Sequence, residues 1–122
     1  MTFRLVVAIT ACLLVATTAS AAAERVITER DSGKTFTVRR GGGLTLRLSS
    51  RYRWVEPKIT GRAIRVTPVS YFTDPGFQEW DVDAVRRGRA RITAIGYDQT
   101  CNAAACTPRR FGVVVVVGPR PS

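Results

Sequence analysis

The chain has 122 residues, and its 19 lysines and arginines outnumber its 9 acidic residues, so its formal net charge is +10. This length favours a single domain. Histidine is absent, which excludes the Ser-His-Asp and Cys-His mechanisms and every zinc site that needs imidazole. The sequence also contains no motif that is typical of a particular reaction. We therefore predict a protein that is not an enzyme and binds no cofactor or metal.

Residues 1–23 have the pattern of a secretory signal peptide. Arg4 supplies the positive charge, residues 5–16 form an apolar run, and residues 17–23 are small and contain A-x-A cleavage signals. An uncleaved membrane anchor is one alternative, because the apolar segment is almost as long as a membrane span. Lipid attachment to Cys12, through a motif that resembles a lipobox, is another. We expect export to the periplasm or the medium, with no stable membrane insertion after cleavage.

The rest of the chain reads as short β-strands separated by turn signals, and no long helix is expected. Over residues 44–48, leucines alternate with polar side chains, which is typical of a strand with one buried face. Pro68 predicts an edge strand, because proline has no N–H to donate to a second neighbour. We predict strands over residues 26–28, 35–38, 44–48, 52–55, 63–69, 79–84, 90–97 and 111–117, and turns over residues 31–34, 39–43 and 74–76.

The second half of the chain is the more regular. Alternation continues over residues 79–84 and 90–97, and the two segments are joined at Gly88, which is free to take a positive φ. Residues 111–117 are nearly all valine, so we expect this strand to be buried on both faces or covered by neighbouring structure.

Two cysteines, Cys101 and Cys106, follow the predicted cleavage site. Exported compartments are oxidising, so we predict a disulfide between them. The ring is small and its chain-entropy effect is only about 2 kcal/mol, so we interpret the bond as a constraint on the loop that it closes. A redox-active pair is the alternative, but the C-x4-C spacing differs from the C-x-x-C of such proteins.

These elements predict an all-β fold. Seven or eight short strands in a domain over residues 24–118 favour a sandwich of two antiparallel sheets, with a closed barrel as the alternative. A domain of this size buries roughly two-thirds of its surface, and we expect Trp54 and Trp80 to fill much of the core. Residues 119–122 are predicted to be a flexible tail.

One motif carries a family resemblance. The pattern W-x-V-x-A-x3-G-x-A-x-I begins at Trp80 and is followed by Tyr97, and Tyr52-x-Trp54 comes after the alternating leucines. Over residues 44–117 the chain resembles the chagasin-like protease inhibitors. The resemblance implies an immunoglobulin-like β-sandwich from an exported family that blocks papain-type cysteine proteases. Such inhibitors insert three loops into the active-site cleft without a covalent bond and without a catalytic residue of their own.

The resemblance also implies which loops touch the protease, although each departs from the family's pattern. The first loop is shorter than the family's Asn-Pro-Thr-Thr-Gly, the second keeps one glycine, and the third carries the disulfide where the family has Arg-Pro-Trp. The resemblance is therefore better evidence for the fold of this chain than for its activity. The contact residues implied are Ser49, Ser50, Arg51, Tyr52, Asp74, Pro75, Gly76, Phe77, Gln99, Thr100, Asn102, Ala103, Ala104, Ala105, Thr107 and Pro108.

Three acidic residues, Glu79, Asp81 and Asp83, are expected on one face of their strand. Calcium binding is one interpretation, but a calcium site needs several further oxygen ligands, which a loop usually supplies. A glycosidase pair is less favoured, because those carboxylates flank a sugar from separate elements. The alternative is a solvated face whose charges are partly met by Arg47, Arg91 or the pair Arg86-Arg87.

The basic residues support a second hypothesis about function. Arginine pairs occur in or beside the predicted turns, at residues 39–40, 86–89 and 109–110. A surface of this charge attracts anionic partners, so the alternative function is a non-catalytic binding module for an anionic cell-envelope polymer or an acidic protein. Nucleic acid would suit the charge, but export removes that partner.

Overall fold

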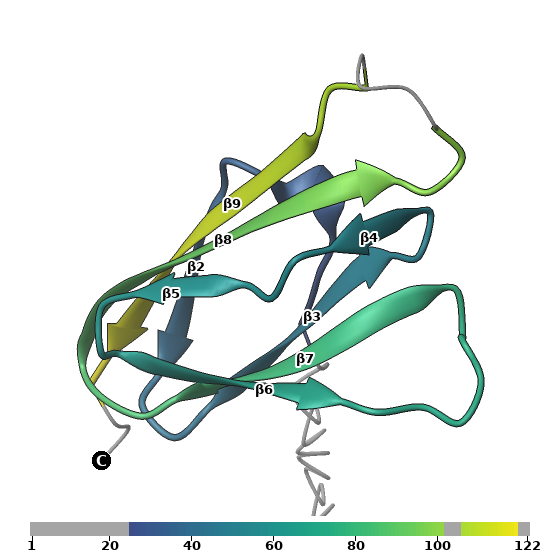
Figure 1. The fold of residues 1–122 in the computed structure, drawn as a ribbon. Coiled ribbons are helices and arrows are strands. Elements are labelled where there is room, and N and C mark those ends of the chain that lie inside the picture. Colours follow the sequence, from purple (N-terminus) through teal and green to yellow (C-terminus); the bar gives the residue numbers. More distant parts are fainter. Residues whose placement is uncertain (1–24, 102–105, 120–122) are drawn as a thin grey trace, which may run out of the picture.

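The computed structural model describes residues 25–101 and 106–119 and shows two packed β-sheets (Figure 1). The predicted signal peptide, the lipobox-like cysteine Cys12, the contact residues Asn102, Ala103, Ala104 and Ala105, and the end of the predicted tail lie outside the described residues. Within residues 25–101 and 106–119, no helix is long and apolar enough to cross a membrane.

The described part of the chain contains nine strands and a single turn of 3-10 helix. They are β1 (Val26–Ile27), η1 (Glu29–Asp31), β2 (Thr35–Arg39), β3 (Gly43–Ser49), β4 (Tyr52–Trp54), β5 (Lys58–Thr60), β6 (Ile64–Val69), β7 (Phe77–Ala84), β8 (Gly88–Asp98) and β9 (Arg109–Gly118). Strand β5 was not predicted, because three residues after a proline are too few to show an alternation.

The first sheet has the strand order β1-β3-β7-β6, and the second has the order β2-β9-β8-β4, with β5 also paired to β8. The predicted all-β sandwich is therefore confirmed, but the sheets are mixed rather than antiparallel. Strand β1 runs parallel to β3, and β2 runs parallel to β9. Alternation along a strand shows which face is buried but contains no information about the direction of the neighbouring strand. These two parallel pairings could therefore not be predicted from the sequence pattern.

The core lies between the sheets and is built from the apolar faces that the alternation predicted. The first sheet contributes Leu44, Leu46 and Leu48 of β3, whose neighbours in register on β7 include Trp80 and Val82. Both tryptophans are buried, as expected. The second sheet contributes Trp54, Ala90, Ile92, Ala94, Phe111, Val113, Val115 and Val117. Each large side chain removed from water in this way stabilises the fold by about 1.5–3 kcal/mol.

The last strand departs from its prediction. Val113, Val115 and Val117 are buried, but Val114 and Val116 on the opposite face are only half-buried. That face lies in register with polar or charged neighbours on β2 and β8. A valine can remain partly exposed there because long side chains such as arginine cover apolar neighbours with their aliphatic stems.

The edge and corner predictions are confirmed. Strand β6, which contains Pro68, is the edge of the first sheet. Gly88 has a φ of 145° and begins β8, where the chain passes from the first sheet to the second. The corner is held by the carbonyl of Ala63, which accepts hydrogen bonds from the N–H groups of Val85 (2.9 Å) and Arg86 (3.1 Å).

Candidate functional site

Three loops meet at one end of the sandwich, the right-hand end in Figure 1. They are the β3–β4 turn, the β6–β7 loop and the β8–β9 loop, which contain the contact residues predicted from the sequence. Ser50 joins all three. Its hydroxyl donates to Asp74 Oδ1 (2.7 Å), its N–H donates to the carbonyl of Gly76 (3.0 Å), and its carbonyl accepts from Gln99 Nε2 (2.9 Å). The loops therefore present one continuous surface.

The β3–β4 turn is held in place by hydrogen bonds to neighbouring side chains. The indole N–H of Trp54 donates to the carbonyl of Ser49 (2.9 Å), and the N–H of Ser49 donates to the carboxylate of Glu29. Tyr52 packs at a ring distance of 5.6 Å on Trp54, and guanidinium groups lie 5.8 Å (Arg51) and 5.5 Å (Arg109) from its ring centre. Tyr52, one of the predicted contact residues, is half-buried, and its ring also supports the turn.

The β6–β7 loop is fastened at both ends. Asp74 accepts hydrogen bonds from Ser50 and from the N–H of Gly76 (2.8 Å), and these bonds, that of Ser50 first, lower the pKa of the Asp74 carboxyl. At the other end, the hydroxyl of Tyr71 donates to Glu79 Oε2 (2.8 Å), and its ring meets Phe77 edge-on at 5.8 Å. Phe77, another predicted contact residue, is half-buried in this cluster.

Phe72 lies between these two fastenings and was missed by the sequence analysis. Its side chain is fully exposed, and its exposed fraction is the largest among the exposed large apolar residues of the described chain. The available signal was the aromatic pair Tyr71-Phe72 directly before the Asp-Pro-Gly turn. Because Tyr71 and Asp74 are both bonded to the scaffold, the loop holds this aromatic ring out toward solvent.

Both carboxylate oxygens of Glu79 accept hydrogen bonds from other side chains of the protein. Glu79 is buried, and its Oε1 accepts a hydrogen bond from Arg47 Nε at 2.6 Å while Oε2 accepts from Tyr71. Arg47 also lies over the ring of Phe77 at 4.7 Å. Asp81 and Asp83 are exposed neighbours on the same face. Within the described residues, no group of three or more acidic or cysteine side chains is placed to hold a metal ion.

This arrangement predicts how stability depends on pH. The guanidinium of Arg47, helped by the Tyr71 hydroxyl and opposed by burial, holds the pKa of Glu79 below its ordinary value. A lowered pKa means that the carboxylate stabilises the fold above its unfolded pKa, and that this contribution is lost as the pH falls through the folded pKa. We expect Glu79→Gln to lower the free energy of unfolding at pH 7 by about 1–3 kcal/mol. The same variant should lose less stability than the unsubstituted chain between pH 5 and pH 3.

Urea unfolding at several pH values measures this difference. Asp81→Asn, which neutralises an exposed carboxylate on the same strand, serves as the matched control. Equal pH dependence in Glu79→Gln and the unsubstituted chain would exclude the proposed role of the Arg47 pair.

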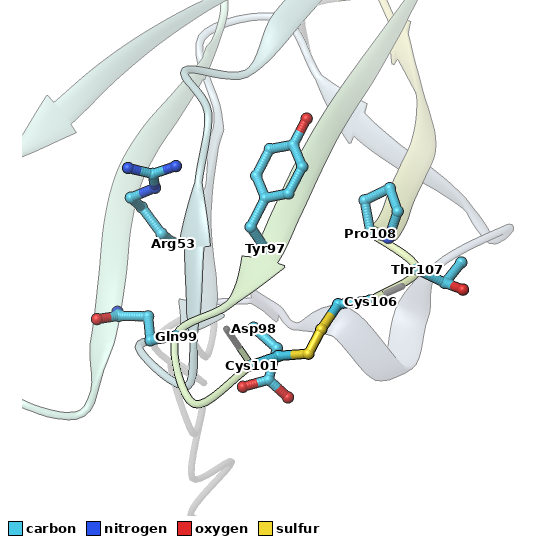
Figure 2. A pocket seen from close by; sticks show the side chains of 8 residues that line it. All are labelled: Arg53, Tyr97, Asp98, Gln99, Cys101, Cys106, Thr107 and Pro108. Atoms are coloured by element: carbon cyan, nitrogen blue, oxygen red, sulfur yellow. A yellow bond between two sulfur atoms is a disulfide. The ribbon is translucent and has the colours of Figure 1, made fainter. Parts of the chain in front are cut away.

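The predicted disulfide lies within the β8–β9 loop and joins Cys101 and Cys106 across a Cα–Cα distance of 6.3 Å. Asp98 accepts hydrogen bonds from Thr100 through its hydroxyl (2.7 Å) and its N–H (2.9 Å), and both bonds lower the pKa of Asp98. Next to the disulfide lies a hollow of about 510 Å³ (Figure 2). It is lined by Arg53, Tyr97, Asp98, Gln99, Cys101, Cys106, Thr107 and Pro108.

A β-sandwich that gathers three fastened loops at one end is the architecture of an immunoglobulin-like, loop-presenting protein. The chain is similar in structure to the cysteine protease inhibitor EhICP2 from Entamoeba histolytica, with a TM-score of 0.56 and 12% sequence identity over 77% of this chain and 94% of that chain. The similarity at this identity concerns the fold, and it confirms the fold that the sequence resemblance implied.

Two further solved structures are similar over comparable lengths. Amebosin, a solution structure, has a TM-score of 0.46 and 16% identity over 78% of this chain and 98% of that chain. PbICP-C, solved in complex with falcipain-2, has a TM-score of 0.46 and 14% identity over 79% of this chain and 99% of that chain. No protein-family model matches the sequence, and no curated protein is significantly similar to it.

Proposed function

We propose that this protein is a non-enzymatic inhibitor of papain-type cysteine proteases, which inserts its three loops into the active-site cleft of the protease. The observation that carries the proposal is the bonding of the three loops through Ser50, on a scaffold with the fold of the inhibitor EhICP2. Loops that are already fixed lose little conformational entropy on docking, so more of the contact energy appears as affinity.

The chemistry of the loops supports a non-covalent mechanism. A protease thiolate needs an electrophile to form a bond, and the side chains of the described loop residues, apart from the disulfide, offer none. The hydroxyl of Ser50 is bonded to Asp74, and the hydroxyl of Ser49 accepts from the N–H of Arg51 (3.2 Å). The disulfide of Cys101 and Cys106 can be attacked by a thiolate, so the non-covalent mechanism requires that the recovered inhibitor show no mixed disulfide with the protease. In the mechanism that we propose, binding rests on shape and on buried apolar surface.

The direct test is a titration of a panel of papain-type proteases with the oxidised chain that begins after residue 23, since we propose that residues 1–23 are removed on export. We expect reversible, competitive inhibition at micromolar concentration or below for at least one enzyme. Activity should return on dilution, and the mass of the recovered inhibitor should be unchanged. A serine protease such as trypsin is the control. If no papain-type protease is inhibited at micromolar concentration, the proposal is wrong.

The disulfide gives a second measurement. In the double variant Cys101→Ser/Cys106→Ser, we expect inhibition to weaken by about tenfold or more while the free energy of unfolding falls by no more than about 2 kcal/mol, because the small ring constrains one loop and few other contacts. Inhibition constants and urea unfolding curves of the two proteins check this expectation. Unchanged inhibition by the double variant would show that the disulfide has no part in binding.

A further inference from the structure

The outer faces of the two sheets differ sharply in charge. Outward-facing strand residues of the first sheet combine three acids, Glu79, Asp81 and Asp83, with the two cations Arg47 and Arg65. The outward-facing strand residues of the second sheet include six cations and no acid. These cations, here called the basic face, are Arg39, Arg53, Lys58, Arg89, Arg91 and Arg110.

The period-two pattern of the strands creates the basic face. Arg89 and Arg91 alternate with the buried residues Ala90 and Ile92 along β8, and Arg110 precedes the buried Phe111 on β9. Arg89 and Arg110 were predicted in or beside turns and Arg91 in a strand, and the structure places all three within strands. In the described parts of the chain, the ion pairs involve Lys34, Arg47 and Arg51, and none includes a member of the basic face.

Apolar and hydroxyl groups lie among these cations. Val55, Ile95 and Tyr97 are 50%, 37% and 43% exposed and border a hollow of about 460 Å³. The cations Lys58 and Arg110 and the acid Glu56, which precedes β5, also line it. Thr93 lines the same hollow. Farther along the sheet, Thr60 of β5 and Val114 of β9 lie in register with Arg91, one on each side. The surface thus combines positive charge, hydroxyls and a small apolar floor.

We infer that the basic face binds an acidic polysaccharide, a linear glycan that carries carboxylates. Guanidinium groups bind carboxylates through paired, charge-assisted hydrogen bonds, threonine hydroxyls match sugar hydroxyls, and the apolar C–H face of a sugar packs on side chains such as Tyr97. Strands that lie side by side form a broad surface along which an extended chain can meet several cations. Single-stranded nucleic acid would instead need several aromatic platforms for its bases, and Tyr97 is the aromatic residue among the outward-facing strand residues of the second sheet.

The basic face extends well beyond the loop surface of the proposed inhibitor, although Arg53 and Tyr97 also line the hollow beside the disulfide. Arg89 and Arg91 lie near the start of β8, whereas the three loops gather beyond its last residue, Asp98. A protein held to a glycan through these arginines would still present its loops to a protease. A loss of glycan binding on substitution of Arg89 and Arg91 can therefore be distinguished from a loss of protease inhibition.

The test uses oligogalacturonate as the carboxylated probe and its methyl ester as the uncharged probe, with binding measured by titration calorimetry at two salt concentrations. We expect the carboxylated probe to bind, the methyl ester to bind at least about tenfold more weakly, and the affinity to fall steeply with salt. Affinity that is insensitive to salt, or equal affinity for the two probes, would overturn the inference.

Two variants locate the site. Arg89→Ser/Arg91→Ser removes two charges from the basic face, and Arg86→Ser/Arg87→Ser removes the same charge from the neighbouring turn. We expect the first variant to bind about tenfold more weakly and the second to change by less than about threefold, with unchanged melting temperatures for both. Equal losses in the two variants would show a response to net charge alone. Tighter binding of a single-stranded DNA of equal charge would also overturn the assignment to a glycan.

Discussion

Replacing Phe72 by alanine is expected to weaken inhibition of a papain-type protease about a hundredfold. The physical reason is that Phe72 is fully exposed on a loop that is bonded to the scaffold through Tyr71 and Asp74. An aromatic side chain held in this way gains its burial only in a complex, and such residues dominate interface energies. Because the ring packs on nothing in the free protein, the free energy of unfolding should change by less than about 0.5 kcal/mol.

Inhibition constants for a responsive protease, together with urea unfolding curves, test this expectation. Val85→Ala is the matched control, since Val85 is an exposed apolar residue at the connection between β7 and β8, the end opposite the loops. Phe72→Leu should retain part of the affinity because leucine keeps much of the apolar area. If the unsubstituted chain inhibits and Phe72→Ala inhibits equally well, Phe72 is not an anchor of the interface.

A large effect on stability is expected from Gly96→Ala. A Cβ atom on Gly96 would lie 2.9 Å from Cε3 and Cζ3 of Trp54 and 2.9 Å from Cβ of Tyr52, closer than atoms in real proteins approach. The neighbours must shift, and overpacking of this kind costs about 1–3 kcal/mol. Since the indole of Trp54 also holds the carbonyl of Ser49, the shift should reach the β3–β4 turn and weaken inhibition as well.

Gly112→Ala is the matched control for this substitution. Gly112 lies on the adjacent strand β9, and a Cβ there would meet its nearest atoms at 3.8 Å, an ordinary contact. We expect its free energy of unfolding to stay within about 0.5 kcal/mol of the unsubstituted chain or to rise slightly, because alanine restricts the unfolded state. A Gly96→Ala variant as stable as Gly112→Ala would show that Trp54 and Tyr52 can shift to make room for the methyl group without a loss of stability.

Much of the scaffold could be predicted because strand faces are encoded locally. The leucines of β3, at positions 44, 46 and 48, are each separated from the next by one residue, so the face that meets the core is visible in a few letters of sequence. The burial of Thr45 on the other face was not predicted. The edge position of β6 followed from Pro68, and the corner followed from Gly88. By contrast, β5 is too short to show a pattern. The alternating burial of β9 could not be read from the sequence because both faces of this strand carry valine.

The loop surface was predicted less completely than the scaffold. The resemblance assigned the three loops, and the structure brings their described parts together. Tyr52 packs on Trp54, Phe77 packs under Arg47, and the contact of both with a protease stays a prediction. Phe72 was missed because an aromatic residue in a sequence is ordinarily assigned to the core. Only the positions of its neighbours reveal that nothing covers this one.

The sequence by itself determined the all-β class, the buried face of most strands, the corner glycine and the pair of cysteines, because each depends on residues close together in the chain. The tertiary structure alone decided the parallel pairing of β1 with β3 and of β2 with β9, the bonding of Ser50 to Gln99, and the gathering of six cations on one face. These features arise from contacts between segments far apart in sequence. The register between strands decides which side chains become neighbours, and no local pattern records that register.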